Sequence, residues 1–353
     1  MGRVQWNLIA SLLAATIAAL AAPPALAQSQ QQTDSCTSRD RALTPDLRIN
    51  ACTTLIQSGQ ERGKSLAPYY AERCRAYNEK GDYARAIEDC NAAIHIDPAN
   101  VNAFLSRGAV YGGKGDADRA IADFDAATRL DPKLAGPFNN RGIAYKAKGD
   151  LDRAIAEFNA AIRLDPNRAT AFLGRGDAYK AKGDLDRAIA DYDEGIRLAP
   201  KRADNYIGRG IANLYGGAPA KALADLDQAS KLDPKDAYAA LWLDIVEKRS
   251  NLVSRLPQGI AQIDMTRWPA PVIRMFLGQM EAQALLAAAD HANAYTKSGQ
   301  VCEANFYSGV LALRQGAKDQ ATRLFRLAVA DCPKDFIELH AANVELKTLG
   351  VTP

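Results

Sequence analysis

The sequence repeats one pattern five times in succession at a constant interval. Each copy has an aromatic residue, then Arg and a small residue, usually Gly-Asp after that, then Ala with Ile or Leu. The copies end at Pro98, Pro132, Pro166, Pro200 and Pro234, which are evenly spaced. A period of this length is typical of stacked supersecondary units that share a continuous core. We therefore expect one elongated body and not a closed globule with a single catalytic pocket.

Residues 101–134 show how one copy is built. Two runs with apolar residues at helical spacing flank a glycine-rich turn at 112–115. The small residues stand where two helices must approach closely, and the aromatic ones fill the space between hairpins. Pro132 cannot continue a helix, because its ring blocks the preceding turn and it has no N–H donor. The copy is therefore predicted to be a helical hairpin.

This pattern resembles the tetratricopeptide repeat. Residues 135–168 match the family's positions with Phe138, Gly142, Tyr145, Ala154, Phe158, Ala161 and Pro166. The resemblance implies an all-α fold, a right-handed superhelical solenoid of antiparallel helix hairpins. Five units are expected at 67–100, 101–134, 135–168, 169–202 and 203–236.

The flanking segments are less regular. Residues 28–66 are expected to form a degenerate capping repeat, and three prolines break residues 237–301 into an irregular helical segment. The period returns as a hairpin at 302–335. Residues 336–353 are expected to form a C-terminal capping helix, with its amphipathic run from Phe336 to Leu349.

Residues 1–27 have the features of a secretory signal peptide. Arg3 precedes an uncharged apolar run from Trp6 to Ala22, and two prolines and Ala25-Leu26-Ala27 follow. The alternative is an uncleaved membrane anchor, because the uncharged run approaches the length of a span. No Cys stands at the cleavage point, so a lipid anchor is not indicated. We expect cleavage, no transmembrane segment afterwards, and a periplasmic or secreted protein of a Gram-negative envelope.

The six cysteines all follow the signal segment, and an even number suits an oxidising compartment. Six cysteines allow 15 pairings, but the positions of the cysteines within the repeat reduce the number of pairings to consider. Two pairs have the same spacing in the sequence, and the third falls at the open ends of one hairpin. We predict Cys36 with Cys52, Cys74 with Cys90, and Cys302 with Cys332. The alternative is that they are buried free thiols.

An arginine and an acid recur at fixed places in every repeat. The arginines are Arg73, Arg107, Arg141, Arg175 and Arg209, and the acids are Asp89, Asp123, Glu157, Asp191 and Asp225. Charges inside a hairpin need partners, so a ladder of ion pairs is expected. The alternative is a basic track for an anionic ligand.

The C-terminal half is similar to that of the NlpI-like periplasmic repeat proteins of Gram-negative bacteria. The similarity lies in Leu241-Trp242-Leu243, Trp268, Phe276-Leu277-Gly278, Asn305-Phe306-Tyr307 and Leu349-Gly350. It implies a dimeric adaptor that brings envelope proteases and peptidoglycan hydrolases together. This chain differs in lacking the lipid-attachment Cys.

The family resemblance also implies a partner-binding groove lined by the first helix of each hairpin. Carried over by position, the groove contains Leu105, Asn139, Ile143, Lys146, Leu173, Asp177, Lys180, Ile207, Ile211 and Tyr215. The Lys and Asn clamp that holds a terminal carboxylate in chaperone-binding members is absent. An extended or helical segment with apolar anchors is the expected ligand. The alternative is that these residues only pack against the next hairpin.

No catalytic constellation stands out. His95, His291 and His340 are scattered, no metal-ligand spacing occurs, and the glycines at 112–115 lack the spacing of a phosphate loop. The charge is nearly balanced, 44 basic against 41 acidic residues, which argues against nucleic acid as the main partner. No cofactor and no catalytic or metal residue is predicted. An enzyme with a Cys nucleophile would need a free thiol.

We therefore expect a non-enzymatic scaffold that binds protein partners and docks an envelope protease or cell-wall hydrolase onto its clients. The family resemblance also implies a homodimer. The alternative is an assembly factor or holdase chaperone for an envelope or secretion complex, which would bind many unfolded chains with little selectivity.

Overall fold

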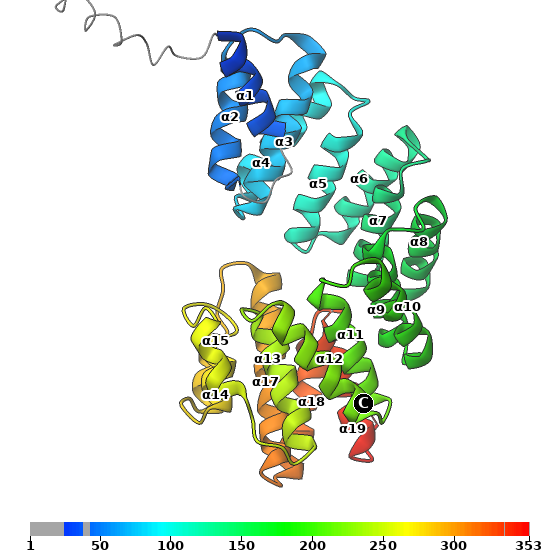
Figure 1. Cartoon of the computed structure of the whole chain (residues 1–353), viewed down its shortest axis with the longest axis vertical. Helices are drawn as coiled ribbons and strands as arrows, with labels where there is room; N and C mark the ends of the chain where they lie inside the picture. The colour runs from blue at the N-terminus through cyan, green and yellow to red at the C-terminus, as the bar shows by residue number, and fades with distance from the viewer. Residues whose placement is uncertain (1–24, 38–42, 335, 353) are drawn as a thin grey trace, which may run out of the picture. The chain divides into compact units, whose positions relative to one another are not determined.

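The computed structural model describes residues 25–37, 43–334 and 336–352, with side chains of the first helix from residue 31 onward. Among these residues the secondary structure is helical, and no strand occurs. The predicted all-α fold is confirmed. The signal segment falls largely outside the described residues; only its last three residues, Ala25–Ala27, begin the first helix. The chain divides into two units, residues 1–107 and 108–353, which are described separately (Figure 1).

The first unit contains two helical hairpins and the start of a third. Its elements are α1 (Ala25–Thr37), α2 (Pro45–Gln57), the 3-10 turn η1 (Gly63–Leu66), α3 (Ala67–Glu79) and α4 (Tyr83–Ile96). The division between the units falls inside α5 (Val101–Gly113). Helix α2 packs on both α1 and α3, as expected of a repeat that ends a stack.

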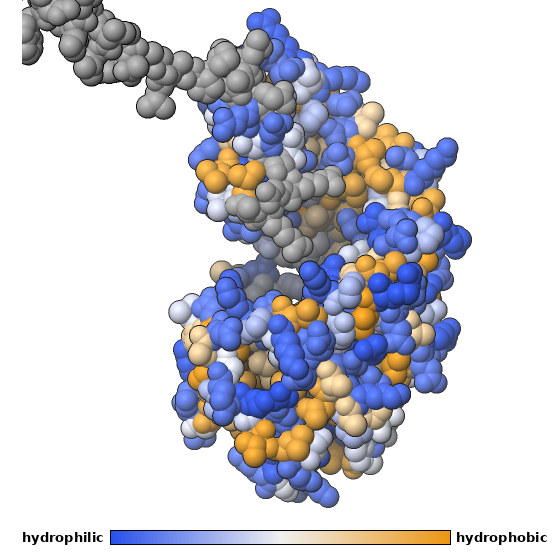
Figure 2. Space-filling view, viewed as in Figure 1, coloured by the Kyte–Doolittle hydropathy of each residue, from blue (hydrophilic) through white to orange (hydrophobic). Residues whose placement is uncertain are grey.

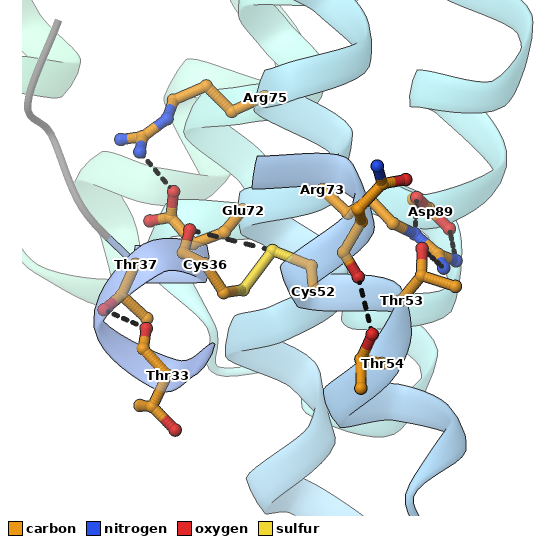
Figure 3. The surroundings of a disulfide bond; sticks show 11 residues. Thr33, Cys36, Thr37, Cys52, Thr53, Thr54, Glu72, Arg73, Arg75 and Asp89 are labelled. Carbon is orange, nitrogen blue, oxygen red and sulfur yellow. Dashed lines mark hydrogen bonds and ion pairs between the residues drawn. A yellow bond between two sulfur atoms is a disulfide. The ribbon is translucent and has the colours of Figure 1, made fainter. Parts of the chain in front are cut away.

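Disulfides hold both hairpins of the first unit. Cys36 in α1 is bonded to Cys52 in α2 (Figure 3). Cys74 in α3 is bonded to Cys90 in α4. All four cysteines are fully buried. Beside the first disulfide, Arg73 donates to Asp89 at 2.7 Å and to Thr53 at 2.9 Å, so it connects α3 to α4 and to α2. The ion pair of Arg73 with Asp89 and the disulfide of Cys36 with Cys52 therefore lie close together.

The second unit contains the regular stack. Its hairpin helices are α6 (Ala117–Leu130), α7 (Ala135–Ala147), α8 (Leu151–Leu164), α9 (Ala169–Ala181), α10 (Leu185–Leu198), α11 (Ala203–Tyr215) and α12 (Pro219–Leu232). Each helix from α6 to α12 packs on its neighbours in sequence, and α7 also contacts α9, as α9 contacts α11. The first helices of successive hairpins thus lie next to each other.

An aromatic ring between two glycines sets the spacing of these hairpins. A Cβ on Gly142 would lie 2.9 Å from the ring of Phe158, and one on Gly174 of the next hairpin only 2.5 Å from the same ring. Such distances leave no room for a side chain, so the ring occupies a slot that only glycine provides. In the first unit, Cys74 and Cys90 stand at the repeat positions of Gly142 and Phe158. The disulfide there replaces the contact between glycine and ring.

The turn between α7 and α8 is fixed by two residues. Gly149, between α7 and α8, has φ +78°, which favours glycine. Asp150 follows and caps α8, accepting the backbone N–H of Arg153 at 3.1 Å. Asp116 and Asp184 cap α6 and α10 in the same way, so these acids are helix caps.

The arginine ladder is confirmed at four positions. Arg73, Arg141, Arg175 and Arg209 pair with the acid predicted for each, within one hairpin. Arg175 also donates to Asn159 of the preceding hairpin at 2.6 Å, and its guanidinium lies over the ring of Phe172. These arginines are therefore bound to the stack and do not form a free basic track.

The remaining elements are α13 (Ala237–Arg249), α14 (Leu256–Gly259), η2 (Ile260–Gln262), α15 (Ala270–Phe276), α16 (Ala282–Ala288), α17 (Ala294–Arg314), α18 (Lys318–Asp331) and α19 (Ile337–Thr348). The short helices α14 and α15 lie beside α13, and α15 also contacts α17 (Figure 1). The sequence places the start of the last hairpin at residue 302, but α17 begins earlier. Asn293 caps this helix by accepting the backbone N–H of Thr296. Cys302 of α17 is bonded to Cys332, which follows α18.

The main apolar core of the second unit lies where these late elements meet the stack. Trp242, Phe306, Tyr307 and Phe325 form a group of neighbouring rings with centroids 5.1 to 6.4 Å apart. The same buried cluster contains side chains of α11 and of α19. Helix α19 therefore packs into the interior of the second unit, beyond the role of a terminal cap.

Candidate partner-binding groove

The predicted groove residues fall into two groups with different surroundings. We call the surface formed by α7 and the residues from Gly108 to Ala120 the open half. We call the surface formed by α9, α11 and α13 against α19 the covered half. Both lie in the second unit. Leu105 belongs to the first unit, where it is half-buried in α5.

The open half contains a pocket of about 320 Å³. Glycines and alanines form most of its lining, and the larger side chains around it are Phe124, Asn140, Ile143 and Tyr295. Ile143 is 47% exposed. None of the lining residues is charged, so the pocket can receive a bulky apolar side chain without removing an ion from water.

One aromatic side chain of this protein, Tyr295, already lines the pocket. Tyr295, in the first turn of α17, lies so close to Gly115 that a Cβ there would be 2.9 Å from the ring. The other side of the Tyr295 ring meets Phe336 edge to face, with centroids 6.2 Å apart. One wall of the pocket therefore comes from a residue distant in sequence and outside the repeat register.

The covered half is closed by the C-terminal helix. Ile207 and Ile211 of α11 lie in the same buried cluster as Ala342 and Leu346 of α19. The hydroxyl of Tyr215 donates to Glu345 of α19 at 3.0 Å, and Arg249 of α13 pairs with the same carboxylate. Ile207 and Ile211 are therefore buried and not accessible to a partner in this structure, and the Tyr215 hydroxyl is hydrogen-bonded to α19.

A charged group lies at the border between the two halves. Asp177 of α9 contacts Lys146 of α7 at 3.1 Å and Lys180 at 3.3 Å, and it accepts the hydroxyl of Tyr192 at 2.7 Å. Burial opposes ionisation of Asp177, but the two lysines outweigh it and lower the pKa of Asp177. Burial lowers the pKa of Lys180. These three predicted groove residues contact one another. They therefore form the border of the open half and are not free to bind a charged group of a ligand.

Two other predicted residues are less accessible than a groove position requires. Asn139 is buried, and its amide donates to Asn140 at 3.1 Å. Leu173 is half-buried beside the cluster that contains Tyr192. Of the predicted groove residues, Ile143 is the one that lines the pocket. The sequence reasoning missed Phe124, Asn140 and Tyr295, and only the position of Asn140 next to Asn139 offered a signal.

The described residues contain no group of three or more His, Cys, Asp or Glu side chains arranged for a metal ion. Within the same ranges, no helix is both long and apolar enough to cross a bilayer. On the face shown in Figure 2, apolar side chains form separate patches among hydrophilic ones. A larger pocket of about 610 Å³ is lined partly by charged residues, among them Asp227, Lys231 and Arg255. The uncharged pocket of the open half is the candidate site for an apolar side chain.

Comparison with known proteins identifies the repeats. Family models described as tetratricopeptide repeat match residues 101–134 and 139–203, and one described as TPR repeat matches residues 75–115. The chain therefore contains tetratricopeptide repeats and has the fold of a protein-interaction scaffold.

Solved structures with this fold include a tetratricopeptide repeat protein from Parabacteroides merdae. It is 18% identical, with a TM-score of 0.50, over 80% of this chain and 98% of that one. PilW, described as a widely conserved type IV pilus biogenesis factor, is 19% identical, with a TM-score of 0.53, over 60% and 98%. MamA is 27% identical over 45% of this chain and 93% of its own, with a TM-score of 0.40.

Proposed function

We propose that this protein is a non-enzymatic adaptor of the bacterial periplasm that binds a segment of a protein partner in the open half of its groove. The observation that carries the proposal is the uncharged pocket of about 320 Å³ beside the exposed side chain of Ile143. A helical or extended segment with a large apolar residue would bury that residue there. Burying one such side chain contributes about 1.5 to 3 kcal/mol.

The periplasmic location is supported by the signal-like segment before residue 28 and by the three cysteine pairs. Structural disulfides are typical of exported proteins and rare in the cytosol. The resemblance to the NlpI-like proteins supports a role in docking an envelope protease or peptidoglycan hydrolase onto its clients. The same resemblance supports a homodimer.

The absence of charge from the pocket lining favours a second candidate, an assembly factor or holdase for an envelope or secretion complex. A pocket lined by Gly and Ala selects for apolar bulk and not for one sequence. Such a protein would bind many unfolded chains. The two candidates share the site and differ in the range of partners.

Affinity capture from the cell envelope tests both candidates. Ile143→Glu would place a carboxylate at the pocket and is expected to lower partner recovery at least tenfold. Leu164→Glu is the matched control, because Leu164 is 40% exposed but lies outside the pocket, at the end of α8. Recovery of one protease or hydrolase with the wild type supports the adaptor, and a broad spread of unfolded outer-membrane proteins supports the holdase. Equal recovery with Ile143→Glu and the wild type would refute the site.

A further inference from the structure

Two buried glutamates lie between the covered half and the C-terminal helices. Glu303 of α17 is 5% exposed and Glu338 of α19 is 4% exposed. Neither forms a salt bridge with a Lys or Arg in the part of the chain that the structure describes. An ionised carboxylate in such a place is costly unless it is paired, so each group favours its protonated form.

The groups around the two carboxyls come from four elements and one loop. Tyr238 of α13 donates to Glu303 at 3.0 Å, and Trp268, from the loop before α15, donates to it at 2.6 Å. Tyr307 of α17 donates to Glu338 at 3.0 Å. Lys180 of α9 and Tyr215 of α11 are titratable groups that interact with Glu338, and Asp236 at the start of α13 interacts with Tyr238. Lys180 is the one cation among these groups.

The electrostatic balance keeps the pair neutral when α19 is in place. Burial and the charge of Glu338 raise the pKa of Glu303 to about 8, although Trp268 and Tyr238 oppose the shift. Burial also raises the pKa of Glu338. A carboxyl exposed to water has a pKa of about 4.3. The closed arrangement therefore holds more protons than an opened one, so opening becomes more favourable as the pH rises.

Helix α19 contacts the covered half through several groups. Its Glu338 lies in the buried pair, its Glu345 contacts Tyr215 and Arg249, and its Ala342 and Leu346 belong to the same buried cluster as Ile207 and Ile211. Release of α19 would expose the apolar side chains of the covered half. These stand at the same repeat positions as the groove residues of the open half.

We propose that α19 is an internal occupant of the groove and that deprotonation of Glu303 and Glu338 releases it, so that the covered half opens at alkaline pH. This inference goes beyond the proposed function and does not depend on it, because opening is a property of the isolated chain. The covered half is then closed at neutral pH, and its opening becomes more favourable as the pH rises.

Hydrogen exchange with mass spectrometry on the full mature chain tests the proposal. Exchange is expressed as protection factors, which correct for the pH dependence of the intrinsic rate of amide hydrogen exchange. Between pH 6 and pH 9, peptides from 203–215 and 337–348 are expected to lose at least tenfold in protection factor, while 135–147 in the open half changes less than twofold. In Glu303→Gln the loss is expected to be smaller than in the wild type, because only Glu338 can still lose a proton. Glu281→Gln, at an exposed glutamate of the same region, should behave as the wild type.

Equal protection of both peptides at pH 6 and pH 9 in the wild type would overturn the proposal, as would an undiminished loss in Glu303→Gln. If Glu303→Gln does not fold, Tyr238→Phe replaces it. That change removes a donor that favours the charged carboxylate, so the loss of protection at pH 9 is expected to exceed the wild-type loss. A loss equal to that of the wild type would contradict the role of Glu303.

Discussion

Ile143 and Ile211 occupy the same position of two repeats, yet one is 47% exposed and the other is fully buried. Lys146 and Lys180 form a second such pair, with side chains 17% and 4% exposed. By their position in the repeat alone, the two members of each pair are equivalent. The covered half is the one on which α19 packs, because Glu345 of α19 contacts Tyr215 and Arg249 there. Groove positions in a repeat protein therefore cannot be assigned as binding residues from their own repeat alone.

The largest expected difference is in stability. Ile211→Ala removes buried methyl groups from the main core and is expected to destabilise the second unit by about 3 to 4 kcal/mol. Ile143→Ala, at the same repeat position in the open half, should change stability by less than about 0.5 kcal/mol. Urea denaturation of both variants checks this. Similar losses from the two changes would mean that the two halves are equally packed.

The disulfide between Cys302 and Cys332 is expected to support the covered half alone. Its sequence separation is 30, and loops of this length typically give about 3 to 4 kcal/mol. Replacing both cysteines by Ala should therefore reduce the hydrogen-exchange protection of α17 and α18. The matched control removes Cys36 and Cys52, which join α1 to α2 in the first unit. Loss of protection in α7 with the first variant would show that the halves are not independent.

The arginine ladder is the feature that the two halves share, so its removal should affect them alike. Arg141→Met and Arg209→Met each leave a carboxylate without its main partner and are expected to cost about 2 kcal/mol. Arg197→Met breaks an exposed pair with Glu194 and should cost less than about 0.5 kcal/mol. Thermal and urea unfolding measure the three. A cost confined to Arg209 would limit the ladder's role to the covered half.

The smallest expected effect is an acid sensitivity of the covered half. Burial, together with Lys180 and Lys347, lowers the pKa of His340 to about 4. Because the folded state binds the proton less well than the unfolded chain, stability falls as the pH drops from about 6.5 to 4. The contribution of His340 to this loss is about 1.8 kcal/mol at pH 5 relative to pH 7, and the protonation of Glu303 and Glu338 opposes it. It is therefore measured as the difference in pH dependence between the wild type and His340→Gln. His95→Gln, at an exposed site, is the control; an equal difference there would exclude His340 as the cause.

The fold could be read from the sequence because its determinants are local. The prolines, the turn glycines and the Arg to acid spacing recur once in each repeat, and each constrains one hairpin. The cysteines are paired in the structure as their register suggested, and mass spectrometry of the exported protein would test those bonds. The position of α19 could not be read in this way. The contact of Glu345 with Tyr215 joins residues far apart in the sequence and belongs to no repeat, and Tyr295 reaches the pocket from a similarly distant segment.

The central claim is that the partner binds in the open half while α19 keeps the covered half closed. Photo-crosslinking in cells tests it most directly, with a photoreactive amino acid at position 143 or at position 211 and the medium at pH 6.5. The account predicts an adduct with a partner protein from position 143 and, from position 211, only crosslinks within the chain. A partner adduct from position 211 as strong as that from position 143 would contradict it.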